Sequence, residues 1–129
     1  MTTLFEKIIA RDIPAVFVYE DEICVVIMDK FPTTRGQCLV IPREAIDYAF
    51  DLSEETYLHC MHIAKSIVHA IDVSLKPIRT CMVIEGFEVP HAHIKLFPCY
   101  EEALDTRQNT EMDDADLKML AEQISKNIV

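Results

Sequence analysis

The sequence predicts an α+β fold, in which a five-stranded antiparallel sheet is combined with one long helix and a short helix at each end. Five short runs rich in β-branched and apolar residues are separated by turn residues. A long helical pattern lies between the third and fourth runs, and strands do not alternate regularly with helices as a parallel sheet requires. Half of the 129 residues are hydrophobic, which suits one domain with a substantial core.

The first helix is expected within residues 2–13. Thr3 can cap its start, and Pro14 interrupts the pattern at its end. Apolar side chains recur between these points at the spacing of one helical face, at Leu4, Phe5, Ile8 and Ile9.

Three strands are expected to follow. Residues 15–21 and 22–29 are β-rich runs joined by an acidic turn near residues 20–21, and they predict a hairpin. A loop containing proline and glycine then leads to a third strand at residues 37–42.

The long helix is expected within residues 51–77. Ser53 is a suitable N-cap, Glu54 and Glu55 favour the first turn, and Pro77 stops the helix. The expected apolar stripe consists of Tyr57, Met61, Ala64, Val68 and Ile71.

Two further strands are expected at residues 78–86 and 90–98, followed by a terminal helix within residues 112–129. The apolar positions of this helix are Leu117, Leu120, Ile124 and Ile128. We expect a single domain over residues 1–129, with a core of about 4–98 and a C-terminal tail and helix at 99–129.

Composition argues against several functional classes. The net charge of -10 gives no general attraction for nucleic acid, although a local nucleotide site remains possible. Only two glycines occur, which excludes a glycine-rich phosphate loop. The five cysteines form no CxxC pair and lie mostly in apolar runs, so we expect reduced, mostly buried thiols. No signal peptide or membrane span is expected, and we expect a cytoplasmic protein.

The segment "VPHAHIKLFP" carries the chemistry. If it forms a strand, alternation places His91, His93, Lys95 and Phe97 on one face, with the intervening residues toward the core. A histidine can act as a nucleophile, and a neighbouring ammonium can stabilise phosphate oxygens. This pattern therefore favours phosphate chemistry.

Two other interpretations stay open at this point. His-x-His on a strand can supply two metal ligands, although the nearby lysine disfavours a cation. The candidates for a third ligand are Cys99, Glu88, His59, His62 and His69. The three helical histidines lie off the expected stripe and should face solvent, and the His-x-His-x-Lys face could also be an exposed polar surface without a task.

"VPHAHIKLFP" resembles the signature of the histidine triad (HIT) superfamily, in which three histidines alternate with apolar residues. The segment "LFEKIIARDIPAVFVYEDEICVVIMDKFPTTRGQCLVIPRE" is also similar to the family's N-terminal half. The resemblance covers residues 4–98. It implies an antiparallel sheet with two helices, usually in a homodimer, without a cofactor. It also implies a purine nucleotide phosphate as substrate and a nucleotidyl-histidine intermediate.

The resemblance assigns roles by matching position. It implies that His93 is the nucleophile and that His91, the first triad member, helps to hold it. Asp29 matches the residue that binds the ribose hydroxyls. The base pocket would be lined by Phe5, Ile27 and Lys30, and the phosphate would be contacted near Glu88 and Val89.

Three departures from the family pattern affect the phosphate site. Lys95 replaces the third histidine, Gln37 replaces a histidine found in many members, and Phe87 replaces a glutamine of the phosphate loop, next to the acidic Glu88. Lysine keeps the positive charge but is a poor proton shuttle near neutral pH. We therefore expect a nucleotide phosphoramidate or nucleotidyl hydrolase or transferase. The alternative is a nucleotide-binding or interaction module of the same fold with weak or no catalysis.

Overall fold

The computed structural model describes residues 2–129 and confirms the α+β fold. Its single described sheet is antiparallel, with the strand order β1-β2-β3-β5-β4. The strands are β1 Phe17–Glu20, β2 Cys24–Met28, β3 Cys38–Pro42, β4 Arg79–Val83 and β5 Ile94–Cys99. The helices are α1 Leu4–Ile9, the short 3-10 helix η1 Ala49–Asp51, α2 Glu54–Leu75 and α3 Asp114–Ser125.

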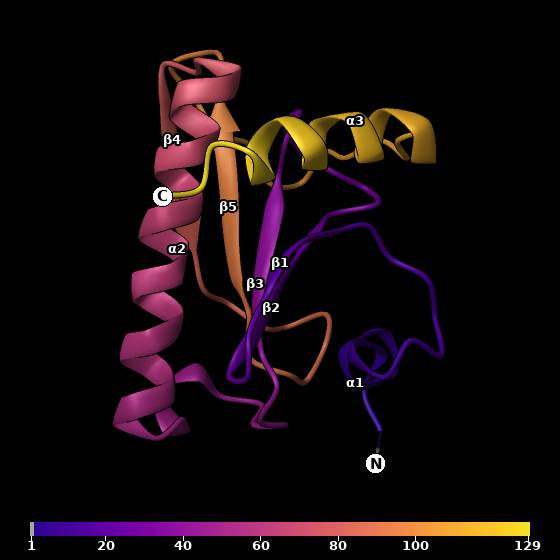
Figure 1. Cartoon of the computed structure of the whole chain (residues 1–129), viewed down its shortest axis with the longest axis vertical. Coiled ribbons are helices and arrows are strands. Elements are labelled where there is room, and N and C mark those ends of the chain that lie inside the picture. Colours follow the sequence, from indigo (N-terminus) through magenta and orange to yellow (C-terminus); the bar gives the residue numbers. More distant parts are fainter. Residues whose placement is uncertain (1) are drawn as a thin grey trace.

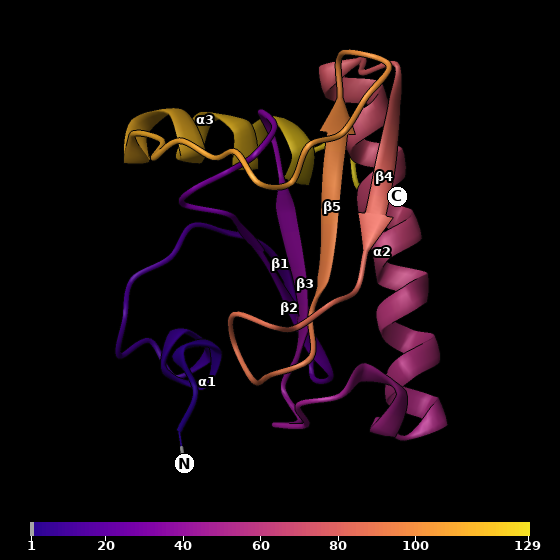
Figure 2. The same ribbon diagram turned by 180° about the vertical axis from the view of Figure 1, so that it is seen from behind.

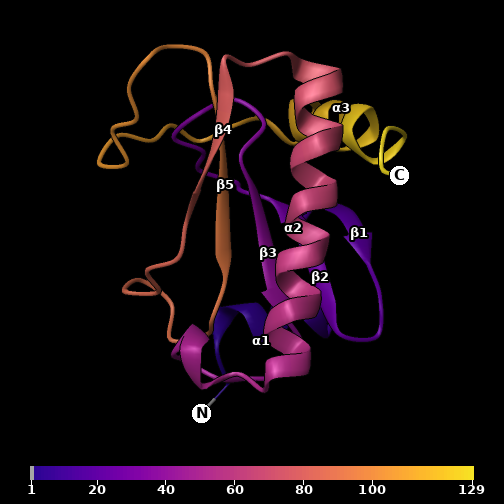
Figure 3. The ribbon, with the colours of Figure 1, turned by 90° about the vertical axis from the view of Figure 1, so that its left-hand side faces the viewer.

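The helices cover both faces of this sheet. Both α2 and α3 pack against one face, whereas α1 packs against the other (Figure 1). Figure 3 shows α2 running along the strands for most of their length. The sheet therefore separates the main core, under α2 and α3, from a smaller apolar cluster under α1.

The side chains of β2 alternate between the two faces of the sheet, so this strand contributes to both apolar clusters. All five of its residues are buried. Val26 belongs to the cluster under α2 and α3, while its neighbours Val25 and Ile27 belong to the cluster under α1. A strand that is covered on both faces reads as a continuous apolar run, which is the pattern seen here.

The long helix begins and ends as expected, but its buried stripe differs from the prediction. Ser53 caps it by accepting a hydrogen bond from the Thr56 amide at 3.2 Å, and Lys76 ends it in the left-handed conformation. The predicted stripe was right in part: Ala64 and Ile71 are buried, and Met61 and Val68 are partly buried against the core. The buried face is wider than the stripe, because the helix meets both the sheet and α3. The buried residues are Cys60, Ile63, Ala64, Ile67, Ala70 and Ile71.

The strand predicted over residues 90–98 begins only at Ile94. Before that point the backbone bonds elsewhere: the His91 amide donates to the Val89 carbonyl, and the Ala92 amide to the Ile46 carbonyl. The two histidines therefore lie in a turn that leads into β5, and not on a regular strand.

The C-terminal tail folds back over the molecule. Figure 2 shows it running from the end of β5 across to α3. The Thr110 amide donates to the Pro32 carbonyl, and the Met112 amide donates to the Lys30 carbonyl. The terminal helix is confirmed over Asp114–Ser125, and its expected apolar residues are buried up to Ile124. Within residues 2–129, no helix combines the length and apolarity needed to cross a membrane.

Candidate active site

His93 is held in one defined ring orientation. Its side chain is buried, and its Nδ1 lies 2.8 Å from the His91 carbonyl oxygen. A carbonyl can only accept a hydrogen bond, so Nδ1 carries the proton and Nε2 keeps a free lone pair. The Phe5 ring packs edge-on against the imidazole, with the ring centroids 4.9 Å apart.

The surroundings of His93 favour the neutral ring. Burial lowers its pKa, the hydrogen bond to the His91 carbonyl raises it, and the Lys95 charge lowers it further, with a lowered pKa as the net result. The ring consequently stays neutral to a lower pH than an ordinary histidine. A neutral imidazole with an available Nε2 lone pair is the form required of a nucleophile.

His91 is completely buried and does not line the cavity beside His93. Its Nε2 lies 2.8 Å from the Pro42 carbonyl oxygen, and its Nδ1 lies 2.9 Å from the Thr3 hydroxyl. The proposed role of His91 is therefore supportive, through its carbonyl. Both histidines are buried, so the alternative of a solvent-exposed polar face is wrong for them.

Lys95 forms an ion pair that the sequence did not indicate. Its Nζ lies 2.7 Å from Oε1 of Glu85. The Lys95 side chain is 13% exposed, whereas that of Glu85 is 34% exposed. The pairing arises because Val83 of β4 lies opposite Lys95 of β5, which places Glu85 just beyond the end of β4. Strand register cannot be read from one sequence, so no sequence signal identifies Glu85.

Asp29 follows β2 and is oriented by a small network. Its Oδ1 accepts a hydrogen bond from the Phe31 amide at 2.8 Å, and its Oδ2 accepts one from Gln37 Nε2 at 3.0 Å. Gln37 is in turn fixed by the Thr33 amide, which donates to its Oε1 at 2.7 Å. Burial raises the pKa of Asp29, opposed by the Phe31 amide and by Lys95. Gln37 therefore holds the carboxylate in place.

Two adjoining cavities bring together most of the predicted site residues. The polar cavity has a volume of about 280 Å³ and is lined by Phe5, Asp29, Gln37, Glu88, Val89, His93 and Lys95, among others. The apolar cavity has a volume of about 610 Å³, and Phe5, Ile27, Asp29 and Lys30 contribute to its wall. Phe5 and Asp29 lie at the junction. A ligand with an apolar ring at one end and an anionic group at the other fits this arrangement.

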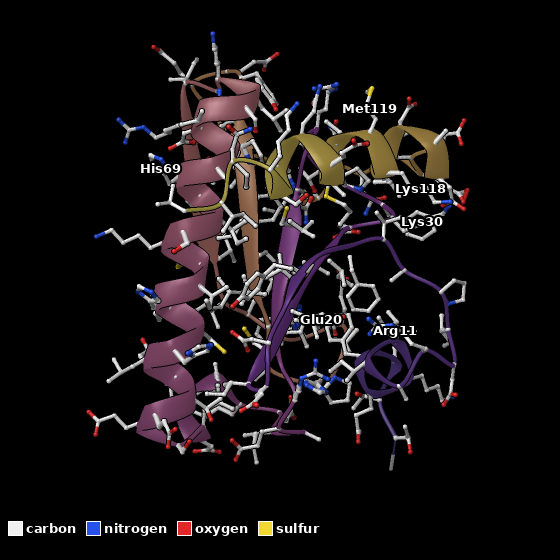
Figure 4. All side chains as sticks on the ribbon, in the orientation of Figure 1. Arg11, Glu20, Lys30, His69, Lys118 and Met119 are labelled. Carbon is white, nitrogen blue, oxygen red and sulfur yellow. The ribbon has the colours of Figure 1, made fainter. Side chains whose placement is uncertain are left out.

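The remaining positions also have clear locations. Lys30 pairs with Asp114 of α3 at 2.7 Å. Lys30 and Lys118 both line the apolar cavity, and Figure 4 shows them on the same side of the molecule. The tail contributes two residues that sequence reasoning missed, Thr106 and Asn109, which line the polar cavity. They reach the polar cavity because the tail hydrogen-bonds to residues 30–32. No local sequence motif predicts that contact.

The metal interpretation finds no support at the triad. Among the described residues, the one group of potential ligands is Asp21, Cys24 and His59, away from His93. His59 Nε2 lies only 2.6 Å from Asp21 Oδ2, whereas nitrogen and oxygen ligands about 2 Å from one tetrahedral zinc ion are more than 3 Å apart. This group is a hydrogen-bonded clamp.

The three helical histidines behave differently from one another. The prediction that all three face solvent was wrong for His59, which is partly buried against Asp21. His62 and His69 are exposed, and Figure 4 shows His69 on the outer side of α2.

Comparison with known proteins defines the family. The HIT domain model matches residues 10–102, so the chain belongs to the histidine triad family. It is 30% identical to "Protein hit" of Bacillus subtilis, over 97% of this chain and 93% of the relative. It is 34% identical to the adenosine 5'-monophosphoramidase of Schizosaccharomyces pombe, over 55% of this chain and 53% of that protein. A HIT-like protein of Bartonella henselae has the same fold, with a TM-score of 0.89 at 24% identity over 98% of this chain and 96% of that one.

Proposed function

We propose that the chain is a nucleotide phosphoramidate or nucleotidyl hydrolase or transferase that acts on purine nucleotide phosphates through a nucleotidyl-histidine intermediate at His93. One observation carries this proposal. The Nδ1 proton of His93 is committed to a carbonyl, and its ring borders a cavity that also contains Asp29 and Lys95. A nucleophile, a candidate ribose ligand and a cation thus surround one space.

The substrate is proposed to span both cavities. The purine occupies the apolar cavity beside Phe5 and Ile27, and the ribose hydroxyls donate to the Asp29 carboxylate at the junction. The α-phosphate then lies in the polar cavity, where Lys95 stabilises its oxygens.

The reaction proceeds in two displacements. The His93 Nε2 lone pair attacks the α-phosphorus, and the bond from phosphorus to the leaving group breaks. An amine leaving group takes up a proton from solvent, whereas a carboxylate departs with the bonding electron pair alone. The nucleotidylated imidazole is positively charged, and its Nδ1–H donates to the His91 carbonyl, which stabilises that charge. Water, or another acceptor in a transferase, then attacks phosphorus and loses a proton to solvent, while the bond from phosphorus to Nε2 breaks and neutral His93 is released.

The nature of Lys95 favours leaving groups that need little help. A lysine ammonium held by Glu85 donates hydrogen bonds but is a poor source of a proton. The amine of a phosphoramidate can depart after gaining its proton from solvent, and an acyl group of an adenylate departs as a stable carboxylate. The related monophosphoramidase of Schizosaccharomyces pombe supports the first class.

A nucleotide-binding module without catalysis is the second candidate. The observation that favours it is the neutralisation of Lys95 by Glu85, together with the exposed carboxylate of Glu88 beside the polar cavity. Both carboxylates weaken the local attraction for a phosphate.

The test is to mix the protein with an adenosine phosphoramidate, quench rapidly under non-acidic conditions and measure the intact mass. We expect an AMP adduct in the starting protein and in His69→Ala, which alters only an exposed histidine, but none in His93→Ala. If AMP binds but neither an adduct nor turnover is detected, the second candidate function, a nucleotide-binding module, is supported and the enzyme is contradicted. Absence of AMP binding would overturn both.

A further inference from the structure

We propose that Thr3 is a positioning residue for the His93 nucleophile and acts through the ring of His91. The inference rests on the proposed function, since it concerns how the reacting histidine is held. Thr3 lies at the N-terminal end of the chain, and its hydroxyl lies 2.9 Å from His91 Nδ1 across a separation of 88 residues.

Hydrogen-bonding partners fix the protonation of the His91 ring. The Pro42 carbonyl, 2.8 Å from Nε2, can only accept, so the proton lies on Nε2. In the neutral ring Nδ1 is then an acceptor, and the Thr3 hydroxyl donates to it. The same hydroxyl oxygen accepts the Glu6 amide at 3.1 Å. The Thr3 hydroxyl and both ring nitrogens of His91 are thus satisfied in a single hydrogen-bonding arrangement.

The anchored ring determines where the His91 carbonyl points. His91 lies before the start of β5, so no strand pairing holds its backbone. Its ring is instead tied to β3 through Pro42 and to the start of α1 through Thr3. The His91 carbonyl accepts the hydrogen bond that His93 Nδ1–H donates, so the orientation of the nucleophile depends on how the His91 ring is held.

A second contact joins the same helix to the nucleophile. Phe5, two residues after Thr3, packs edge-on against both imidazoles, with centroid separations of 5.9 Å to His91 and 4.9 Å to His93. Loss of the Thr3 hydroxyl removes the hydrogen bond between the start of α1 and His91 but leaves the packing of Phe5 against both imidazoles.

The capping box of α1 supplies a matched control. Thr3 also caps the helix, so its removal could act simply by loosening the helix start. Glu6 provides the reciprocal half of the box, with its Oε1 accepting the Thr3 amide at 3.0 Å. Glu6→Ala weakens the helix start but keeps the hydroxyl bond to His91, so it separates the two effects.

The experiment compares Thr3→Val, Thr3→Ser and Glu6→Ala in the full chain. We expect Thr3→Val to slow AMP adduct formation at His93 by about 10-fold, because small displacements of a reacting group have large effects on rate. KM should stay nearly constant. Thr3→Ser, which restores the hydroxyl, and Glu6→Ala should both react at close to the starting rate. An equal loss in Glu6→Ala would assign the effect to the helix start and overturn the proposal.

A readout that needs no substrate separates this proposal from the proposed function. In nitrogen NMR spectra, His91 Nδ1 should report a hydrogen-bonded acceptor and His93 should report protonation at Nδ1. Thr3→Val should abolish the first signature and give His93 a mixture of tautomers. If this change occurs but the starting protein forms no adduct, the function fails and the positioning stands. If Thr3→Val leaves His93 and its rate unchanged, the positioning fails and the function stands.

Should Thr3→Val fail to fold, Thr3→Gly provides the same test. Glycine is tolerated at a helix N-cap, but it has no side chain that could donate to Nδ1 of His91. The same loss of rate is expected, because the His91 ring loses its link to the start of α1. A Thr3→Gly protein with unchanged His93 signals and unchanged rate would overturn the proposal.

Discussion

At the scale of single residues, Lys95 stands in place of the third histidine, and we expect it to supply a positive charge without transferring a proton. Its ammonium has three donors and no acceptor, and Glu85 holds it at 2.7 Å in a largely shielded position. Under the proposed function, a leaving group that requires a proton must take it from solvent. The proposed substrates are therefore those whose leaving groups depart without a proton from the protein.

Substitutions at Lys95 test this interpretation. Lys95→Arg keeps the charge and should retain activity within a few-fold, whereas Lys95→Met should lose about 100-fold in the rate of adduct formation. Lys95→His should raise the rate with poor leaving groups, because histidine can deliver a proton near neutral pH. Single-turnover rates with leaving groups of graded pKa provide the measurement.

Glu85 requires its own control in this series, because Lys95→Met leaves its carboxylate unpaired. Combining Lys95→Met with Glu85→Gln removes both charges. Comparison of this double variant with Glu85→Gln alone gives the contribution of the lysine without an unpaired carboxylate, and the full double-mutant cycle gives the coupling between the two residues. Retention of full activity in this double variant would show that the cation has no role in the reaction.

At the scale of elements, the β1–β2 hairpin is fastened to α2 through Asp21. Its Oδ1 accepts the amides of Ile23 and Cys24, and its Oδ2 is shared by the Tyr19 hydroxyl and the His59 ring. Burial alone would raise the pKa of Asp21, but these hydrogen bonds, led by that of the Cys24 amide, lower it well below its usual range. The carboxylate thus joins a turn to a helix far along the chain.

The stability of this clamp should depend on pH. Asp21→Asn should cost about 1–3 kcal/mol of folding free energy at neutral pH, the usual value of hydrogen bonds to a charged group. Because the folded pKa lies below the unfolded one, the stabilisation is complete above the ordinary pKa of aspartate and declines as pH falls below it.

Urea unfolding at a series of pH values measures this effect. Glu22→Gln is the matched control, because Glu22 is an exposed carboxylate in the same turn. The difference between Asp21→Asn and the starting protein should shrink in acid, while the Glu22→Gln protein should follow the starting protein throughout. A difference that is independent of pH would rule out the ionised carboxylate as its source.

At the scale of the whole molecule, the two edges of the sheet are unlike. Strand β1 packs under α3, whereas β4 forms the opposite edge with Met82 and the preceding Ile78 exposed. An uncovered edge strand with apolar side chains invites pairing with another chain. The homodimer implied by the family resemblance remains a prediction, and β4 is the surface on which we place it.

Light scattering coupled to size exclusion tests the dimer. Met82→Glu should convert it to a monomer, because a carboxylate would be buried at the interface. Met119→Glu is the matched control, since Met119 is similarly exposed but lies on α3 at the other side of the molecule (Figure 4). A starting protein that is monomeric at all concentrations, or equal behaviour of the two variants, would contradict an interface at β4.

Local pattern was sufficient for much of the fold. Helix caps, apolar runs and turn residues act over a few positions, so Ser53 and Pro77 bounded the long helix correctly. Local pattern was insufficient where a segment contacts residues far away in the sequence. The full buried face of α2 depends on α3, and the course of residues 90–93 depends on the hydrogen bond from the Ala92 amide to the Ile46 carbonyl.

The sequence by itself determined the chemical groups of the site: the His-x-His pair, the lysine in third place and the aspartate that ends β2. Only the tertiary structure decided how they are held, through Glu85 beside Lys95, Thr3 beside His91 and Gln37 beside Asp29. The physical reason is that a side chain's identity is local, whereas its protonation, orientation and charge balance are set by neighbours that strand register and chain crossings bring together.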